Sequence, residues 1–408
     1  MEGFPASARV LYISYDGMTD SLGQSQVIAY LKRLGKKGVT ITILSFEKQE
    51  VFKEKRNVIE NDLSGTTIKW VPLYYTKKPP IFSTIKDIFS GIKTATNLHK
   101  NESFTIVHCR GYIAGLIGRS LKKKFPIKQI FDMRGWWPDE KKESNAWEGI
   151  IYMPVYKYFK WVEKKLFKES DKVISLTYSG KREIVKNHWK KPEEIGVIPT
   201  CVDFEIFQSF QENIKKQVRV ELEIPLEAKV IVYSGSLGGN YSLQDLFNIY
   251  KAFVSVDPNG YFLILSKTDP SIVLNHLLNH NISAKQIIVK SVDFKSVYKY
   301  LQASDVGIIL YQKSFSVIGR SPTKLGEYWA CGIPVLSLKG IGDLDEIAEQ
   351  YSDGIELVED FSFHQLRLSM IKLFDKGYQK ELLNEFSREY FSIDTGVEFY
   401  YNIYRELS

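Results

Sequence analysis

One segment late in the chain, SVIGRSPTKLGEYWACGIPV, combines residue types that suit a nucleotide. Pro322 marks a helix start, because proline is favoured in a first turn, and the N–H groups of Thr323 and Lys324 would point out of that start toward an anion. Arg320 and Lys324 add positive charge. Glu327 follows one turn later, where a carboxylate can accept two hydrogen bonds from a ribose diol. The alternative is a solvated helix carboxylate.

A long loop near the start of the chain, from Tyr15 to Gln26, follows a predicted strand and opens a helix. Gly17 and Gly23 allow close backbone approach, and Ser25 can cap the helix. Free N–H groups at such a helix start suit a phosphate or a sugar hydroxyl, although a plain strand-to-helix turn is the alternative. The candidate residues in this loop are Asp16, Gly23, Gln24 and Ser25.

Two further groups of ionisable residues follow strands of the same predicted sheet. Arginine can hold an anionic group through two hydrogen bonds, and tryptophan can stack on a sugar ring. An Asp–Arg ion pair with a packed aromatic turn is the alternative interpretation. The candidates are His108 and Arg110 in the first group, and Asp132, Arg134, Trp136 and Asp139 in the second.

A glycine-rich turn, SGSLGGNY, lies between the first strand and the first helix of the second half. Backbone amides in such a turn can surround a phosphate, but the turn lacks the GxGxxG spacing. Its candidate residues are Gly235, Ser236, Gly238 and Gly239.

No metal site is expected. His276 and His280 share a helix face but lack the glutamate of a zinc-binding HExxH motif, and Asp343 with Asp345 fits a helix start better than a metal. The three cysteines are far apart and form no CxxC pair, which disfavours a disulfide framework and favours a reducing cytoplasm.

The elements that must position these loops alternate between short apolar strands and amphipathic helices, a pattern typical of parallel sheets. The alternation pauses near residue 200 and then restarts. We therefore predict an α/β protein with two Rossmann-like domains. The predicted parts are a first domain over residues 1–200, a second domain over 201–385, and a helical segment over 386–408.

Composition and charge exclude several classes of protein. The chain is 44% hydrophobic and 13% aromatic, which disfavours disorder, and no apolar run approaches the roughly 20 residues that span a bilayer. Residues 1–200 carry a net charge of +14 and residues 201–408 carry −7. The basic half indicates an anionic partner or a solvated basic surface; no nucleic-acid motif is present.

A helix predicted within residues 151–168 suggests what that partner is. Its lysines at 157, 160, 164 and 168 fall on one stripe, beside Tyr158, Trp161 and Val162. This pattern is typical of a helix that rests on an anionic membrane, although a helix packed on the sheet with a solvated basic edge is the alternative. We expect a cytoplasmic protein, with peripheral attachment to the inner face of the plasma membrane as a hypothesis.

Taken together and in this order, the motifs resemble the GT-B glycosyltransferases, specifically the family-4 (group 1) retaining enzymes. The opening LYISYDGMTDSLGQSQVIAYLKRLGKKG, the stretch VISLTYSGKREI before IGVIPTCVDFEIF, and SPTKLGEYWACGIPVLSL carry the resemblance, which covers nearly the whole chain. It implies two Rossmann-like domains facing across a cleft, with an acceptor-binding domain over residues 1–200 and a nucleotide-sugar-binding domain over 201–385. It also implies that the C-terminal helix, within 386–408, crosses back to the first domain.

The resemblance also implies an activity: transfer of a sugar from a UDP- or GDP-linked donor to a glycan or polyprenyl-type lipid-linked acceptor. Retention at the anomeric carbon, no metal or other cofactor, and a role in cell-surface polysaccharide or lipopolysaccharide synthesis are implied as well. By matching position, Glu327 would bind ribose, Val292 would contact the base, and His108 would lie near the reacting sugar. The remaining residues implied in donor binding, with Arg320 and Lys324 as catalytic cations, are Ser321, Thr323, Gly235, Ser236, Gly238 and Gly239.

Two departures from the family pattern keep other functions open. Gly319 stands where the family often has a second glutamate, and the stretch 236–242 lacks the family's Arg and Lys phosphate pair, for which Arg320 and Lys324 could substitute. The alternatives are a nucleotide-sugar epimerase of the same build and a non-catalytic nucleotide-sugar-binding protein.

Overall fold

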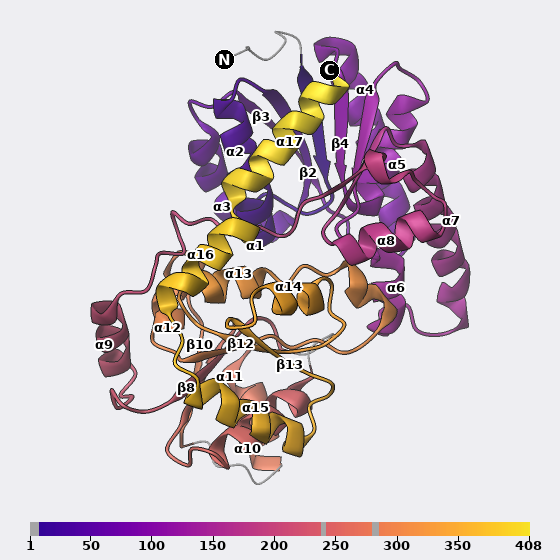
Figure 1. Cartoon of the computed structure of the whole chain (residues 1–408). Helices are drawn as coiled ribbons and strands as arrows, with labels where there is room; N and C mark the ends of the chain where they lie inside the picture. Colours follow the sequence, from indigo (N-terminus) through magenta and orange to yellow (C-terminus); the bar gives the residue numbers. More distant parts are fainter. Residues whose placement is uncertain (1–7, 238–241, 280–284) are drawn as a thin grey trace. The chain divides into compact units, whose positions relative to one another are not determined.

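The computed structural model describes residues 8–237, 242–279 and 285–408 (Figure 1). The chain divides into two compact units. Unit 1 comprises residues 1–200 together with 393–408, and unit 2 comprises residues 201–392. Each unit contains a parallel sheet covered by helices, as the strand–helix alternation predicts.

Unit 1 contains a seven-stranded sheet in the order β3-β2-β1-β4-β5-β6-β7. Its central strands are buried along almost their whole length, as expected for a parallel sheet covered on both faces. The strands are β1 (Arg9–Ser14), β2 (Thr40–Glu47), β3 (Ile68–Tyr74), β4 (Ile106–Arg110), β5 (Lys128–Asp132), β6 (Lys172–Ser175) and β7 (Ile195–Val197).

The helices of unit 1 connect these strands in chain order. They are α1 (Ser21–Gly23), the π-helical η1 (Gln24–Ile28), α2 (Ala29–Lys36), α3 (Gln49–Leu63), α4 (Phe82–Glu102), α5 (Gly111–Lys122), α6 (Trp137–Glu143), η2 (Ile150–Tyr152), α7 (Met153–Glu169), α8 (Tyr178–Lys186) and η3 (Pro192–Glu194). α5 packs between α4 and α7.

The C-terminal helix α17 (Ile393–Leu407) belongs to unit 1 and packs on α2 (Figure 1). The predicted start of the returning segment, residue 386, is wrong. The division falls after Ser392, whose extended backbone ends α16 and separates it from α17.

Two tyrosines fasten α17 to the sheet of unit 1. The Tyr404 hydroxyl lies 2.7 Å from His108 Nδ1, and the Tyr400 hydroxyl donates to Asp132 Oδ2 at 3.0 Å. All four side chains are buried. Because buried polar groups are costly when unpaired, these bonds make the helix part of the folded core rather than a loose tail.

Unit 2 contains a six-stranded parallel sheet in the order β10-β9-β8-β11-β12-β13. Its last strand, β13, is only four residues long, and the sequence IELV gives too short an apolar pattern to predict it. The strands are β8 (Val230–Ser234), β9 (Tyr261–Leu265), β10 (Ile287–Lys290), β11 (Val306–Ile308), β12 (Val335–Leu338) and β13 (Ile355–Val358).

The helices of unit 2 begin within the polar stretch that follows residue 200. They are α9 (Glu212–Glu221), α10 (Leu243–Val254), α11 (Pro270–Asn279), η4 (Phe294–Ser296), α12 (Val297–Gln302), η5 (Phe315–Gly319), α13 (Thr323–Ala330), α14 (Leu344–Gln350), α15 (Phe363–Asp375) and α16 (Lys380–Phe391). Among the described residues, no helix is both long enough and apolar enough to cross a bilayer.

The tyrosines of α17 generate a stability prediction. Tyr404→Phe removes a hydroxyl that pairs with the buried His108, so the free energy of unfolding of the chain should fall by about 1 to 3 kcal/mol in urea denaturation. Phe399→Tyr, which changes an exposed ring on the same helix, should leave it within about 0.5 kcal/mol of wild type. Equal stability of the two variants would contradict the fastening role.

Candidate active site

The strand order of each sheet reverses at one place. In unit 1 the reversal lies between β1 and β4, and in unit 2 it lies between β8 and β11. Crevices outside the carboxyl ends of the strands at such a reversal are the usual ligand sites of open parallel sheets. The candidate residues can therefore be judged by their distance from these two places.

At the reversal in unit 1, the structure brings Asp16 and Arg110 together. Asp16 follows β1 and is exposed, whereas Arg110 is the last residue of β4 and is buried. Arg110 Nε lies 3.4 Å from Asp16 Oδ2. Burial opposes the charge on Arg110, but the interactions with Tyr12, Asp16 and Asp132 outweigh it and raise the pKa of the guanidinium. A permanent cation and an exposed carboxylate thus share this edge of the sheet.

Glu47, the last residue of β2, holds the loop after β1. Its buried carboxylate accepts hydrogen bonds from the backbone N–H groups of Met18 at 2.7 Å and Thr19 at 3.1 Å, and from the Thr19 hydroxyl at 2.6 Å. The N–H groups of Met18 and Thr19 are therefore not available to a phosphate, because an internal carboxylate already accepts their hydrogen bonds. The loop keeps its shape without a ligand.

The same loop is closely packed around its glycines. A Cβ on Gly23 would lie 2.1 Å from the Gly17 carbonyl oxygen, so only glycine fits there. Ser25 does not cap a helix: it lies inside η1 and its hydroxyl donates to the Ser21 carbonyl at 2.8 Å. Gln24 donates from its side chain to the Thr19 carbonyl at 3.2 Å. Gly23, Gln24 and Ser25 therefore shape the loop from within.

His108 does not lie at the sheet edge, and that expectation is wrong. It occupies the middle of β4, and its ring packs against Tyr12, Tyr400 and Tyr404 with 1% of its surface exposed. Burial lowers the pKa of the imidazole, in spite of Asp132 nearby, so the ring is held neutral. His108 supports α17 and does not face solvent.

Asp132 is buried at the end of β5 and lies close to three polar side chains. Its Oδ2 accepts from Tyr400 and lies 3.7 Å from His108 Nε2 and 3.8 Å from a terminal nitrogen of Arg134. Arg134 adopts a positive φ of 56° directly after the strand, a backbone conformation that is strained for a residue other than glycine. Of this group, Arg134 is the partly exposed member.

Trp136 and Asp139 are placed in the core rather than toward a ligand. Trp136 is fully buried and packs on Phe167 and Trp189, so the expectation that it stacks on a sugar is wrong. Asp139 accepts from the Tyr156 hydroxyl and from Lys160, each at 2.8 Å. The alternative interpretation, a packed aromatic turn with ion pairs, describes this segment.

At the reversal in unit 2, Tyr328 of α13 joins the two central strands. The backbone N–H of Ser234 donates to the Tyr328 hydroxyl at 3.0 Å, and that hydroxyl donates to the Ile308 carbonyl at 3.3 Å. A Cβ on Gly307 would lie 2.6 Å from the Tyr328 ring, so β11 needs glycine there. The bridge holds the first half of α13 beside the turn that starts with Gly235 and Ser236. Gly238 and Gly239 lie outside the described residues.

α13 and the loop before it carry the predicted nucleotide-binding residues. α13 begins at Thr323 after Pro322, with no side-chain cap, and the loop before it contains Arg320 and Ser321. Lys324 Nζ lies 2.6 Å from Glu327 Oε2, and Glu327 is 3% exposed. A carboxylate and an ammonium therefore stand side by side at one helix start, next to the carboxyl ends of β8 and β11.

The other predicted donor residue, Val292, lies between β10 and η4 and is half-buried against the core of unit 2. Among the described residues, no cluster of three or more His, Cys, Asp or Glu side chains could hold a metal ion, and His276 and His280 have no described side chains.

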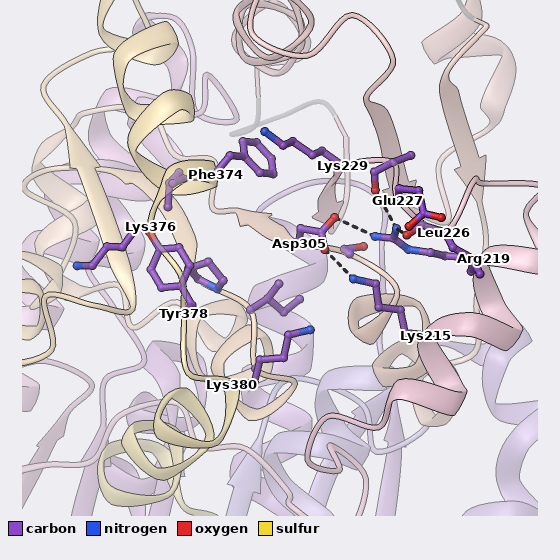
Figure 2. Close-up of a pocket in the computed structure, with 16 residues that line it drawn as sticks. Lys215, Arg219, Leu226, Glu227, Lys229, Asp305, Phe374, Lys376, Tyr378 and Lys380 are labelled. Carbon is purple, nitrogen blue, oxygen red and sulfur yellow. Dashed lines mark hydrogen bonds and ion pairs between the residues drawn. The ribbon is translucent and has the colours of Figure 1, made fainter.

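A separate cavity of about 270 Å³ lies in unit 2, lined by Lys215, Arg219, Asp305 and Lys380 among others (Figure 2). Asp305 directly precedes β11, so this cavity lies at the amino ends of the strands, away from α13's first turn. Asp305 is paired with Lys215 at 3.0 Å and with Arg219 at 2.8 Å. Burial lowers the pKa of Lys380 to about 8. The cavity thus differs in place from the predicted donor site.

Sequence reasoning missed the residues that hold the site together. Glu47, Tyr328, Tyr400 and Tyr404 belong to no local motif, and the partners described above lie between 20 and 296 positions away in the chain. Only the sheet order brings them into contact. Of these residues, only Glu47 could have been found from the sequence. A carboxylate at the end of an apolar, buried strand requires hydrogen-bond donors, which predicts that the side chain is bonded internally.

Comparison with known proteins finds similarity to glycosyltransferases in both sequence and structure. Residues 23–206 match the model of Glycosyltransferase Family 4. A D-inositol 3-phosphate glycosyltransferase of Corynebacterium glutamicum is 21% identical over 88% of this chain and 85% of its own length. The match to its namesake from Thermomonospora curvata spans about half of that relative, 53%.

Solved structures share the fold. A glycosyltransferase from Rickettsia africae superposes with a TM-score of 0.72 at 16% identity, covering 98% of both chains. The HepE protein of Anabaena, solved in complex with UDP and glucose, gives a TM-score of 0.72 at 10% identity over 97% of this chain and 99% of its own. With the two parallel-sheet units, these findings show that the chain has the GT-B fold and that its residues 23–206 are similar to Glycosyltransferase Family 4.

Proposed function

We propose that the chain is a retaining glycosyltransferase that moves a sugar from a nucleotide-sugar to a glycan or lipid-linked acceptor in the synthesis of cell-surface polysaccharide or lipopolysaccharide. The observation that carries the donor assignment is the pairing of Lys324 with Glu327 on α13, at the reversal of the second sheet. A nucleoside diphosphate needs both groups: a carboxylate for its ribose diol and cations for its phosphates.

The donor would bind along the start of α13. Glu327 accepts hydrogen bonds from the ribose hydroxyls, while Lys324, Arg320 and the backbone from Ser321 to Thr323 face the diphosphate. The binding of UDP and glucose by the HepE protein of Anabaena, which shares the fold, supports a UDP-linked donor. No metal is needed in this scheme, because the two cations carry the charge of the leaving group.

The reaction would depend on charge stabilisation at the leaving group. As the bond between sugar and phosphate breaks, negative charge develops on the diphosphate, and fixed cations beside it lower the barrier. Retention then follows when the acceptor attacks on the face that the diphosphate leaves, with a phosphate oxygen taking the acceptor proton. On the acceptor side, Asp16 and Arg110 lie at the reversal of the first sheet and would orient acceptor hydroxyl or phosphate groups.

The place of this reaction would be the inner face of the plasma membrane. The α7 surface, defined as Lys157, Lys164 and Lys168 with Tyr158 and Trp161, is exposed. Each lysine near an anionic surface contributes about 1 kcal/mol of attraction. The predicted stripe is wrong in one member: Lys160 turns inward, where it pairs with Asp139 and Glu163.

The ribose assignment predicts the effect of Glu327→Gln. This change keeps the shape but removes the charge, and each charge-assisted hydrogen bond is worth about 1.5–3 kcal/mol, so UDP affinity in calorimetry should fall about tenfold or more. Glu349→Gln, on the exposed side of α14, should leave the affinity at the wild-type value. An unchanged UDP affinity of the Glu327 variant would refute the assignment.

The diphosphate assignment predicts selective losses for the cations. Lys324→Ala and Arg320→Ala should each weaken binding of UDP about tenfold while changing uridine binding much less, because uridine lacks the phosphates. Affinities for both ligands, measured by calorimetry, give the comparison. Parallel losses for UDP and uridine would show that the two side chains support the fold of the loop instead.

The α7 surface predicts salt-sensitive vesicle binding. Changing Lys157, Lys164 and Lys168 to Gln should weaken co-sedimentation with phosphatidylglycerol vesicles at low salt about tenfold or more. A matched variant with Lys36, Lys53 and Lys186 changed to Gln loses the same charge from other exposed positions and should bind like wild type. If both variants lose binding equally, the attraction comes from net charge and not from α7.

A further inference from the structure

The first half of α4 carries an apolar stripe that no other part of the described chain covers. Phe82, Ile85 and Phe89 are 72%, 43% and 69% exposed. Their spacing of three and then four residues places them on one face of the helix, within about one third of its circumference. The opposite face of α4 packs on α5, so the helix does not need this stripe for its own fold.

Lysines surround the stripe. Lys86 and Lys93 are exposed and fall on the same face of the helix, and Lys77 and Lys78 are exposed just before it. Between residues 76 and 101 the sequence contains one acidic residue, Asp87, and it is buried. This stretch therefore carries five ammonium groups, four of them beside the stripe, and no exposed carboxylate.

Asp87 points inward and joins α4 to the carboxyl edge of the first sheet. Its Oδ2 accepts hydrogen bonds from the Tyr15 hydroxyl at 2.9 Å and from the Thr76 backbone N–H at 3.0 Å. Tyr15 directly precedes Asp16, which pairs with Arg110 at the reversal of the sheet. The start of α4 is thus fixed next to the proposed acceptor residues.

Large exposed apolar side chains flanked by lysines match one environment well. At the surface of an anionic bilayer, rings and aliphatic side chains enter the boundary between headgroups and acyl chains, while lysine stems extend toward the phosphates. We propose that the α4 stripe, defined as Phe82, Ile85 and Phe89, lies in the interface of an anionic phospholipid bilayer and anchors the enzyme there.

This inference rests on the proposed function in one respect: it selects a lipid-linked acceptor over a soluble glycan. Because Asp87 and Tyr15 connect the stripe to the acceptor loop, a bilayer under α4 holds the loop near the headgroup region. A sugar acceptor attached to a membrane lipid is presented at that same level. The stripe differs from the α7 surface in kind, since α7 supplies mainly charge and α4 supplies apolar anchoring.

The test is vesicle binding by a triple variant, Phe82→Ser with Ile85→Ser and Phe89→Ser. Wild type should bind vesicles of phosphatidylglycerol and phosphatidylcholine at low salt and keep a measurable fraction of that binding at high salt, because apolar contacts are not screened. The triple variant should bind about tenfold less at low salt and not at all at high salt. Wild-type binding by the triple variant would overturn the proposal.

A matched control removes apolar surface elsewhere. Val58→Ser with Val220→Ser and Phe363→Ser changes three residues that are 58%, 72% and 53% exposed on other helices, and it should bind like wild type. In a separate variant, Phe89→Trp, the tryptophan emission should shift to the blue when vesicles are added. No shift, or an equal loss in the control, would also overturn the proposal.

UDP affinity and oligomeric state distinguish a bilayer anchor from a donor-site defect and from a dimer contact. UDP affinity should be the same for wild type and the triple variant. If wild type binds UDP normally but does not bind vesicles, the α4 anchor is refuted and the donor assignment is unaffected. If the stripe instead joins two copies of this chain, wild type will sediment as a dimer and the triple variant as a monomer, and that result would overturn the bilayer assignment.

Discussion

The hydroxyl of Tyr328 is the contact on which the donor half of the site depends. It accepts from the Ser234 N–H on one central strand and donates to the Ile308 carbonyl on the next, in a setting where the ring is fully buried. Burial raises the pKa of this hydroxyl, so it stays protonated and can serve both bonds. Because the residue before it is Glu327, the bridge fixes the carboxylate and its partner Lys324 at the reversal of the sheet.

The acceptor half depends on a different kind of constraint. Its loop is shaped by a buried carboxylate, Glu47, and its sheet is covered by a helix from the far end of the chain through Tyr400 and Tyr404. Both interactions satisfy buried polar groups internally. The edge therefore offers a ligand the exposed Asp16 with its partner Arg110, and beside them the partly exposed Arg134. The sheet edge therefore has a defined shape before any substrate arrives.

The first and last residues of unit 2 are joined by hydrogen bonding. The Val202 N–H donates to the Phe391 carbonyl at 2.7 Å, and Val202 forms a parallel bridge with Ser392, so the entry and exit strands of unit 2 lie together. Gly326 of α13 allows this, since a Cβ there would lie 2.6 Å from Val202 and 3.0 Å from Phe391. The donor helix thus packs directly on these paired residues.

Local pattern was enough to predict the alternating elements, the two sheets and the helix start at Pro322, because each depends on neighbours in sequence. Local pattern failed to predict the position of side chains that contact residues far away in the sequence. His108 looked like an edge residue, but β4 extends two residues further and α17 covers the ring. Trp136 looked like a ligand platform, but Phe167 and Trp189 enclose it. Lys160 looked like part of a basic stripe, but Asp139 and Glu163 draw it inward.

The central claim is that the start of α13 is the donor site. The most direct measurement is a crystal structure of the full chain with UDP. The account predicts a ribose whose hydroxyls lie within hydrogen-bond distance of Glu327 and a diphosphate beside Arg320 and Lys324. UDP bound elsewhere, for instance in the cavity around Asp305 and Lys380 at the opposite edge of the sheet, with Glu327 and Lys324 still paired only to each other, would contradict it.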